Sequence, residues 1–119
     1  MSQDFRTDTT HEAYQTARAA GHLDDGCRLC DAVTVQAFEN WRIVNNRFPY
    51  DAVATTHHML VPTRHVTEDE LTTAEVAELL EIKQTALSEY DCVIESLPHN
   101  KSIPEHHHIH LVVIKDDIK

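Results

Sequence analysis

Four histidines fall within five consecutive residues, 106 to 110, and an apolar, β-branched run follows them. Residues 109–114 read as a strand, in which side chains alternate between the two faces. His106, His108 and His110 then share one face, while His107 shares the other face with the apolar side chains of the run. Neighbours in the row are about 7 Å apart, whereas His106 and His110 are roughly 13 Å apart and too distant for one metal ion. The row therefore favours divided roles over a single three-histidine metal site.

The pattern outside this row predicts an α+β domain. Apolar, β-branched or alternating runs predict extended segments over residues 32–37, 41–44, 58–61, 93–94 and 109–114. Helices are predicted over residues 9–20 and 74–90, with a short helix opened by a capping-box spacing at residues 67–70. Because the strands come in pairs with short connections, we expect an antiparallel sheet with helices on one side.

The two longer helices carry more detailed expectations. For the first helix, Thr9 or Thr10 is the predicted N-cap and Gly21 the predicted stop. In the second helix, periodicity predicts an apolar stripe and a solvent-exposed face. The predicted stripe comprises Val76, Leu79, Leu80, Ile82 and Leu87, and the predicted wet face comprises Glu75, Glu78, Glu81 and Glu89.

Length and charge limit the classes of function. A chain of 119 residues is expected to form one domain. A formal net charge of -10 argues against a nucleic-acid polymer as partner, because such a partner requires a basic stripe. A nucleotide ligand stays possible, since a few local donors can hold a phosphate. No apolar run is long enough for a membrane span, and the polar N-terminus does not resemble a secretory signal, so we expect a cytoplasmic protein.

The cysteines divide into a pair and a single residue. Cys27 and Cys30 form a C-R-L-C motif, which in a chain without an export signal indicates a metal or redox pair before a structural disulfide. Cys92 lies alone between a helix pattern and a strand pattern. It is predicted to be a small buried core residue.

The histidine row allows more than one interpretation from its residues alone. It could be a solvated sheet face, or it could supply metal ligands to a cupin-like oxygenase. The segment His-His-His-Ile-His-Leu-Val at residues 106–112 resembles the signature of the histidine triad (HIT) family. The upstream run Thr-His-His-Met-Leu-Val-Pro-Thr-Arg-His-Val at residues 56–66 resembles the family's second signature. The resemblance extends over about residues 27–114 and implies a HIT-like domain at 27–119, after a partly helical extension at 1–26.

The resemblance implies a chemistry for the row. His108 would be the nucleophile, attacking a phosphate bound to a nucleoside and forming a nucleotidyl-histidine intermediate. A backbone carbonyl would accept a hydrogen bond from the other ring nitrogen of His108 and fix its tautomer. His110 would donate a hydrogen bond to the phosphate or the leaving group. Ser102 would bind or protonate the leaving group.

Further residues are implied to contact the nucleotide. The family's Gly-Gln before the serine is replaced by Asn100-Lys101, so Lys101 or the amide of Asn100 is expected to bind phosphate. Asn46 would face the ribose, with Asn45 as an equal candidate. His57 would lie near the nucleotide, although a core histidine is an equally good interpretation.

Many members of the family carry a structural zinc ion. The implied ligands here are Cys27, Cys30, His65 and His106, which would make a closed tetrahedral site. The resemblance also implies a homodimer. Two functional hypotheses follow: an enzyme acting on dinucleoside polyphosphates or nucleoside phosphoramidates, and a non-catalytic nucleotide-binding or scaffold protein of the same fold.

Overall fold

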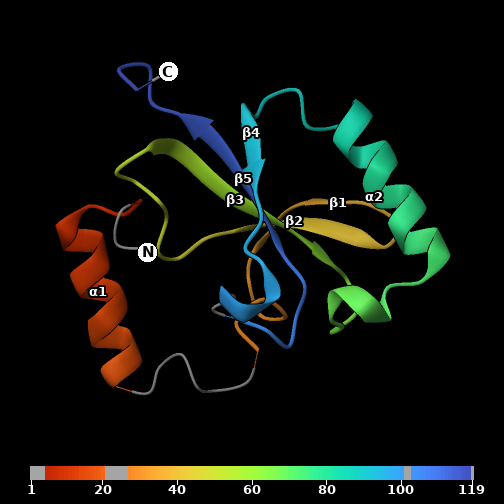
Figure 1. The fold of residues 1–119 in the computed structure, drawn as a ribbon, viewed down its shortest axis with the longest axis horizontal. Coiled ribbons are helices and arrows are strands. Elements are labelled where there is room, and N and C mark those ends of the chain that lie inside the picture. The colour runs from red at the N-terminus through yellow and green to blue at the C-terminus, as the bar shows by residue number, and fades with distance from the viewer. Residues whose placement is uncertain (1–4, 21–26, 101–102, 119) are drawn as a thin grey trace.

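Five strands form one antiparallel sheet in the computed structural model, which describes residues 5–20, 27–100 and 103–118 (Figure 1). The strands are β1 (Thr34–Ala37), β2 (Trp41–Asn45), β3 (Ala54–Pro62), β4 (Cys92–Ile94) and β5 (Ile109–Ile114). Their spatial order is β1-β2-β3-β5-β4, and every neighbouring pair is antiparallel. Two α-helices, α1 (Asp8–Ala19) and α2 (Thr73–Thr85), accompany the sheet. The predicted α+β class with an antiparallel sheet is therefore confirmed.

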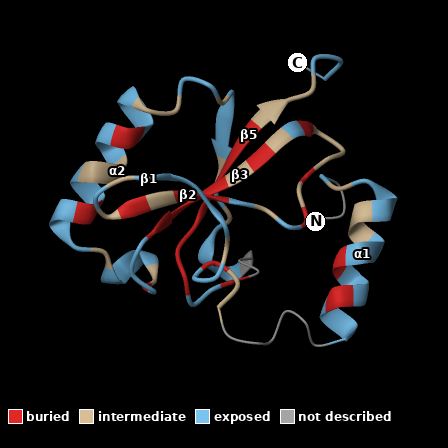
Figure 2. Cartoon of the chain, turned by 180° about the vertical axis from the view of Figure 1, so that it is seen from behind, coloured by how far each residue is buried: buried red, intermediate tan, exposed pale blue. Residues whose placement is uncertain are grey.

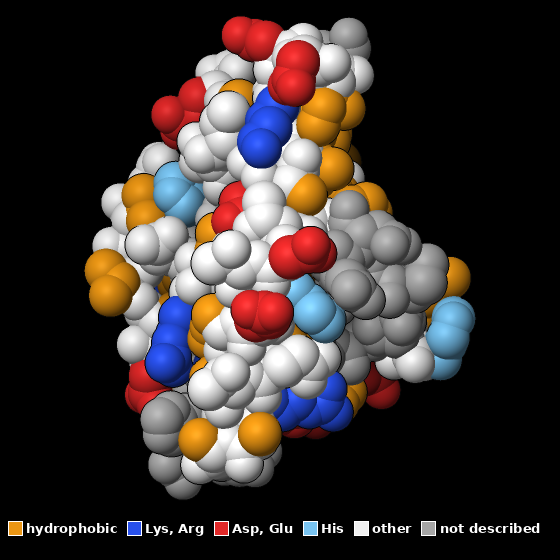
Figure 3. Space-filling view, turned by 90° about the vertical axis from the view of Figure 1, so that its left-hand side faces the viewer, with side chains coloured by type: hydrophobic (Ala, Val, Ile, Leu, Met, Phe, Trp, Pro, Cys, Tyr) orange, Lys and Arg blue, Asp and Glu red, His pale blue; other side chains and the backbone are white. Residues whose placement is uncertain are grey.

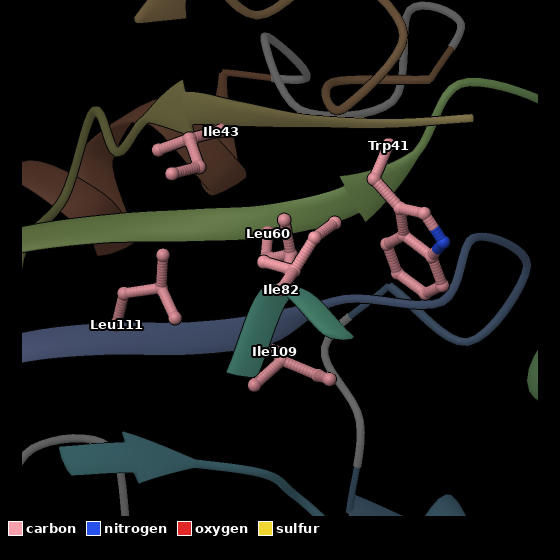
Figure 4. Packing of buried hydrophobic residues seen from close by; sticks show 6 residues of the cluster. All are labelled: Trp41, Ile43, Leu60, Ile82, Ile109 and Leu111. Atoms are coloured by element: carbon pink, nitrogen blue, oxygen red, sulfur yellow. The ribbon is translucent and has the colours of Figure 1, made fainter. Parts of the chain in front are cut away.

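The three central strands carry most of the buried core residues, whereas β1 and β4 at the two edges are largely exposed (Figure 2). On one face of the sheet, Ile82 of α2 packs onto apolar side chains from β2, β3 and β5, among them the indole ring of Trp41 (Figure 4). This cluster comprises Trp41, Ile43, Leu60, Ile82, Ile109 and Leu111. The opposite face carries a second cluster comprising Leu29, Val44, Met59, Val61 and Ile103. Strand alternation places His110 on this second face, because it pairs with Met59 across β3 and β5.

Helix α2 departs from the periodicity-based expectation in three ways. It ends at Thr85, five residues before the predicted end, and a turn then leads to Tyr90. Val76 and Leu80, assigned to the apolar stripe, are 52% and 58% exposed. Glu75, assigned to the wet face, is only 2% exposed. The sheet therefore contacts a narrower side of α2 than the sequence stripe predicts.

A fork of hydrogen bonds explains how Glu75 is buried. Its carboxylate accepts from Nε and an Nη atom of Arg64 at 2.9 and 2.7 Å. It also accepts from the backbone N–H of Thr72 at 2.8 Å, which completes a capping box at the start of α2. The hydrogen bonds from Arg64 are the main reason that the pKa of Glu75 is lowered to about 2.

Helix α1 lies on the side of the sheet away from α2, so the expectation that the helices share one side is wrong (Figure 1). Its buried residues, Tyr14 and Ala17, pack on Phe48 in the loop after β2. The N-cap is Thr7, whose side chain accepts from the N–H of Thr10, so the predicted cap at Thr9 or Thr10 is wrong. The predicted stop at Gly21 lies outside the described residues.

Two further expectations concern β4 and the membrane. Cys92 is exposed, not buried, because β4 is a short strand at the edge of the sheet, beside β5. Among the described residues, no helix has both the length and the apolar character that a bilayer span requires.

Candidate functional site

Four sulfur and nitrogen donors converge beside the sheet. Cys27, Cys30, His65 and His106 each offer one ligand atom, and these atoms all lie within 4.8 Å of one another. Sγ of Cys27 lies 3.4 Å from Nδ1 of His106, and Sγ of Cys30 lies 3.3 Å from Nδ1 of His65. The four residues predicted to share a metal site therefore form a cluster that could hold a metal ion.

The surroundings of the cluster fit a metal. Nε2 of His106 donates to the carbonyl of Pro62 at 3.0 Å, which leaves the lone pair of His106 on Nδ1, facing the two sulfurs. A backbone acceptor on the second nitrogen is the usual way in which a metal-binding histidine is oriented. Burial and the neighbouring Cys27 raise the pKa of Cys30 to about 11. A divalent cation would reverse this shift, because thiolates are its ligands.

His108 is buried and held in one tautomer. Its Nδ1 lies 3.0 Å from the carbonyl oxygen of His106, and a carbonyl can only accept, so Nδ1 carries the proton. In neutral His108 the lone pair is therefore on Nε2. Strand β5 begins at Ile109, where the predicted strand begins, so His106, His107 and His108 precede it. The bend in this segment lets His106 reach the cysteines while its carbonyl orients His108.

His110 is the last member of a hydrogen-bonded chain that starts at the backbone. The N–H of Tyr50 donates to Nδ1 of His57 at 2.9 Å, which places the proton of neutral His57 on Nε2. Nε2 of His57 lies 2.8 Å from Nδ1 of His110, so it donates there and leaves the proton of His110 on Nε2. That N–H lies 3.4 Å from the hydroxyl of Tyr50. Burial lowers the pKa of His57 to about 3 and that of His110 to about 2, which keeps both neutral.

A pocket of about 500 Å³ opens over His108 and His110. Asn45 and Asn46, the candidates for ribose contact, both line it. His57 lies behind this wall, 4% exposed, and connects to the pocket through His110. Ser102 and Lys101, predicted to bind the leaving group and the phosphate, lie outside the described residues.

Three arginines that the sequence analysis missed also line the pocket: Arg6, Arg28 and Arg47. The sequence analysis instead assigned phosphate binding to Lys101 or the amide of Asn100. The signal that could have identified these arginines was the scarcity of basic residues, because the chain has only ten Lys and Arg residues against twenty Asp and Glu residues. On the face shown in Figure 3, acidic and basic side chains are interspersed, and histidines reach the surface at separate points.

Comparisons with known proteins give similarity at the level of structure. No family model matches the chain, and no curated protein matches it in sequence. A HIT family hydrolase from Clostridium thermocellum superposes with a TM-score of 0.54 and 16% identity, covering 77% of this chain and 93% of the other. A structure described as a Hit-like protein superposes with a TM-score of 0.51 and 11% identity, over 81% and 96% of the two chains.

A third solved structure is described as a hypothetical histidine triad nucleotide-binding protein from Sulfolobus tokodaii strain 7. It superposes with a TM-score of 0.52 and 17% identity, covering 77% of this chain and 70% of the other. At such identities a likeness establishes architecture. This chain therefore has the fold of the histidine triad proteins.

Proposed function

We propose that the chain is a nucleotide phosphohydrolase or nucleotidyl transferase of the HIT type. Its substrate would be a nucleoside phosphate conjugate, either a dinucleoside polyphosphate or a phosphoramidate. The observation that carries the proposal is the hydrogen bond from Nδ1 of His108 to the carbonyl of His106, which presents Nε2 as the nucleophilic atom of a residue lining the pocket. A neutral imidazole in a fixed tautomer is the state that an attack on phosphorus requires.

The reaction has two steps in which His108 is first consumed and then restored. Nε2 of His108 forms a bond to the phosphorus, and the bond from phosphorus to the leaving group breaks with its electron pair. The leaving group takes a proton, for which Ser102 is the proposed donor. Water or another hydroxyl acceptor then attacks the phosphorus and gives up a proton, which returns to Ser102, while the nitrogen–phosphorus bond breaks with its electron pair on Nε2 and neutral His108 is restored. The N–H on Nε2 of His110 would stabilise the charge on the phosphate oxygens in both steps.

We propose zinc as the metal of the four-residue cluster. Two thiolates and two imidazoles make the closed tetrahedral set that is typical of structural zinc. When bound, the ion would supply stability and no chemistry. His106 would connect the two sites, because its ring would be a ligand while its carbonyl orients His108.

A substitution at His108 tests the proposal directly. His108→Asn should lower turnover of adenosine phosphoramidate and of diadenosine tetraphosphate by a factor of about 10³ or more, because covalent catalysis is lost. Nucleotide affinity, measured by calorimetry with AMP, should change little. His99→Asn is the matched control, because His99 is exposed in a short 3-10 helix, and it should leave turnover unchanged.

Mass spectrometry of the rapidly quenched wild type should find the nucleotidyl group on His108. An adduct on His107 or His110, or normal turnover by His108→Asn, would contradict the assignment. Tight AMP binding without turnover of either substrate would instead support the second hypothesis, a non-catalytic nucleotide-binding protein.

A further inference from the structure

The N-terminal segment holds Arg6 in a defined position at the pocket. On one side of Arg6, the carbonyl of Phe5 accepts from the N–H of Ala52 at 2.9 Å. On the other side, the N–H of Thr7 donates to Oδ1 of Asp51 at 2.9 Å, and the hydroxyl of Thr10 donates to the same carboxylate. Both anchors lie in the loop between β2 and β3, so the backbone at Arg6 is fixed to the wall of the pocket.

The guanidinium of Arg6 is itself partly anchored. Nε donates to the carbonyl of Phe48 at 2.8 Å, and Cζ lies 4.6 Å from the ring centre of Tyr14 and 5.1 Å from that of Tyr50. One terminal nitrogen, Nη1, is buried and makes no hydrogen bond with the part of the chain that the structure describes. A buried guanidinium N–H without an acceptor is costly, and an entering anion would provide one.

The electrostatics of the pocket also favour an anion. Among the described residues that line it, there are three guanidinium groups, from Arg6, Arg28 and Arg47, against one carboxylate, from Asp31. Burial lowers the pKa of Arg6, and repulsion from Arg28 contributes to the shift. The pocket therefore concentrates positive charge in a chain whose formal net charge is -10.

Arg6 lies one aromatic ring away from the histidines. The ring centre of Tyr50 is 5.1 Å from Cζ of Arg6 and 5.0 Å from the ring centre of His110. The ring of His108 follows at 5.2 Å from that of His110. A ligand that extends along the rings of His110 and Tyr50 would therefore reach both His108 and Arg6.

We propose that Arg6 is a specificity-determining residue that binds the phosphate chain beyond the phosphorus attacked by His108, and selects ligands with two or more phosphates. The inference rests on the proposed function and makes it more specific. A ligand with one phosphate leaves Arg6 without an acceptor, whereas a polyphosphate engages it with charge-assisted hydrogen bonds. Dinucleoside polyphosphates are then preferred over nucleoside phosphoramidates, which carry one phosphate.

Calorimetry at low salt and pH 7 tests this with three probes: inorganic tripolyphosphate, ADP and AMP. The wild type should bind ADP about tenfold more tightly than AMP, or better. Arg6→Gln should weaken tripolyphosphate and ADP binding by about tenfold or more and AMP binding by much less. Arg18→Gln is the matched control, because Arg18 is exposed on α1 and the change in net charge is the same. It should bind all three probes as the wild type does.

The failures of the two proposals are distinguishable. If the wild type binds tripolyphosphate through Arg6 but binds neither AMP nor ADP, the proposed nucleotide function is wrong and the anion site at Arg6 stands. A folded Arg6→Gln protein that binds ADP and tripolyphosphate as tightly as the wild type would overturn the role of Arg6 alone. If this variant does not fold, the proposal is tested in the wild type by following the NMR resonance of the Arg6 Nε–H. A shift on adding tripolyphosphate supports the proposal, and an unchanged resonance overturns it.

Discussion

At the scale of single residues, backbone groups fix the ring protons of the site. The N–H of Tyr50 can only donate and the carbonyl of His106 can only accept, so the tautomers of His57, His110 and His108 follow from them. A carboxylate in these positions would titrate with pH, whereas the peptide groups do not. The backbone groups that orient the rings therefore keep the same donor or acceptor role at every pH.

Replacing His57 with Phe tests this chain of hydrogen bonds. Nδ1 of His110 would lose its donor at 2.8 Å, so the proton of His110 would no longer be confined to Nε2. We expect a mixture of tautomers in a long-range ¹H–¹⁵N spectrum and a fall in kcat of about tenfold or more, with KM changed less.

The neighbouring position provides the control for this experiment. His58 lies on the other face of β3, where Nδ1 contacts the hydroxyl of Tyr90 at 2.7 Å. His58→Phe should leave the His110 tautomer and kcat as they are in the wild type. A single Nε2–H tautomer in His57→Phe would show that other contacts set the proton of His110.

The sequence predicts residues that belong to a recognisable signature better than residues that are placed by contacts outside any signature. The resemblance to the HIT signatures implied that Cys27, Cys30, His65 and His106 come together, and one ligand atom from each lies within 4.8 Å of the others. The zinc itself stays a prediction. Arg6 could not be found in this way, because its position depends on hydrogen bonds with residues more than forty positions away, such as Asp51.

At the scale of elements, α2 shows where periodicity fails. Hydrophobicity alone assigned Glu75 to the solvent, yet a buried carboxylate is acceptable when it is fully hydrogen-bonded. Arg64 and the N–H of Thr72 supply those bonds and tie the end of β3 to the start of the helix. The sequence was sufficient to predict that a helix forms here. Which side of α2 is buried, and where the helix ends, depended on contacts with residues of other elements.

Glu75→Gln should therefore destabilise the protein although it removes no apolar contact. The amide cannot accept the full fork from Arg64, and we expect a loss of roughly 1–3 kcal/mol in the free energy of unfolding, measured with urea. Glu81→Gln, on the exposed side of the same helix, is expected to stay within about 0.5 kcal/mol of the wild type. Equal stability of the two variants would mean that the fork contributes nothing measurable.

At the scale of the whole molecule, the Cys–His cluster joins segments that lie far apart in sequence. Cys27 and Cys30 precede β1, His65 follows β3, and His106 precedes β5. Closing such long loops is costly for the chain, so a metal that links them is expected to contribute stability.

Removing one ligand should therefore affect the entire fold. Cys30→Ser is expected to lose bound zinc, measured by elemental analysis, and about 2–3 kcal/mol of stability, or roughly 10 °C in Tm. Cys92→Ser removes the remaining thiol, which is exposed on β4, and should retain both metal content and Tm. Zinc-free wild-type protein with an unchanged Tm would contradict the proposal of a structural zinc.

Strand β3 has a consequence for how far sequences of this fold can diverge. Its side chains alternate between the site, at His57 and Met59, and the core under α2, at Leu60. A shift of β3 by one residue relative to its neighbouring strands would move its site residues into the core and its core residues into the site. Selection for packing and selection for chemistry therefore act on the same strand register. By contrast, all four residues of β1 are exposed. Neutral drift is therefore expected to accumulate at the edges of the sheet, while the middle strand changes slowly.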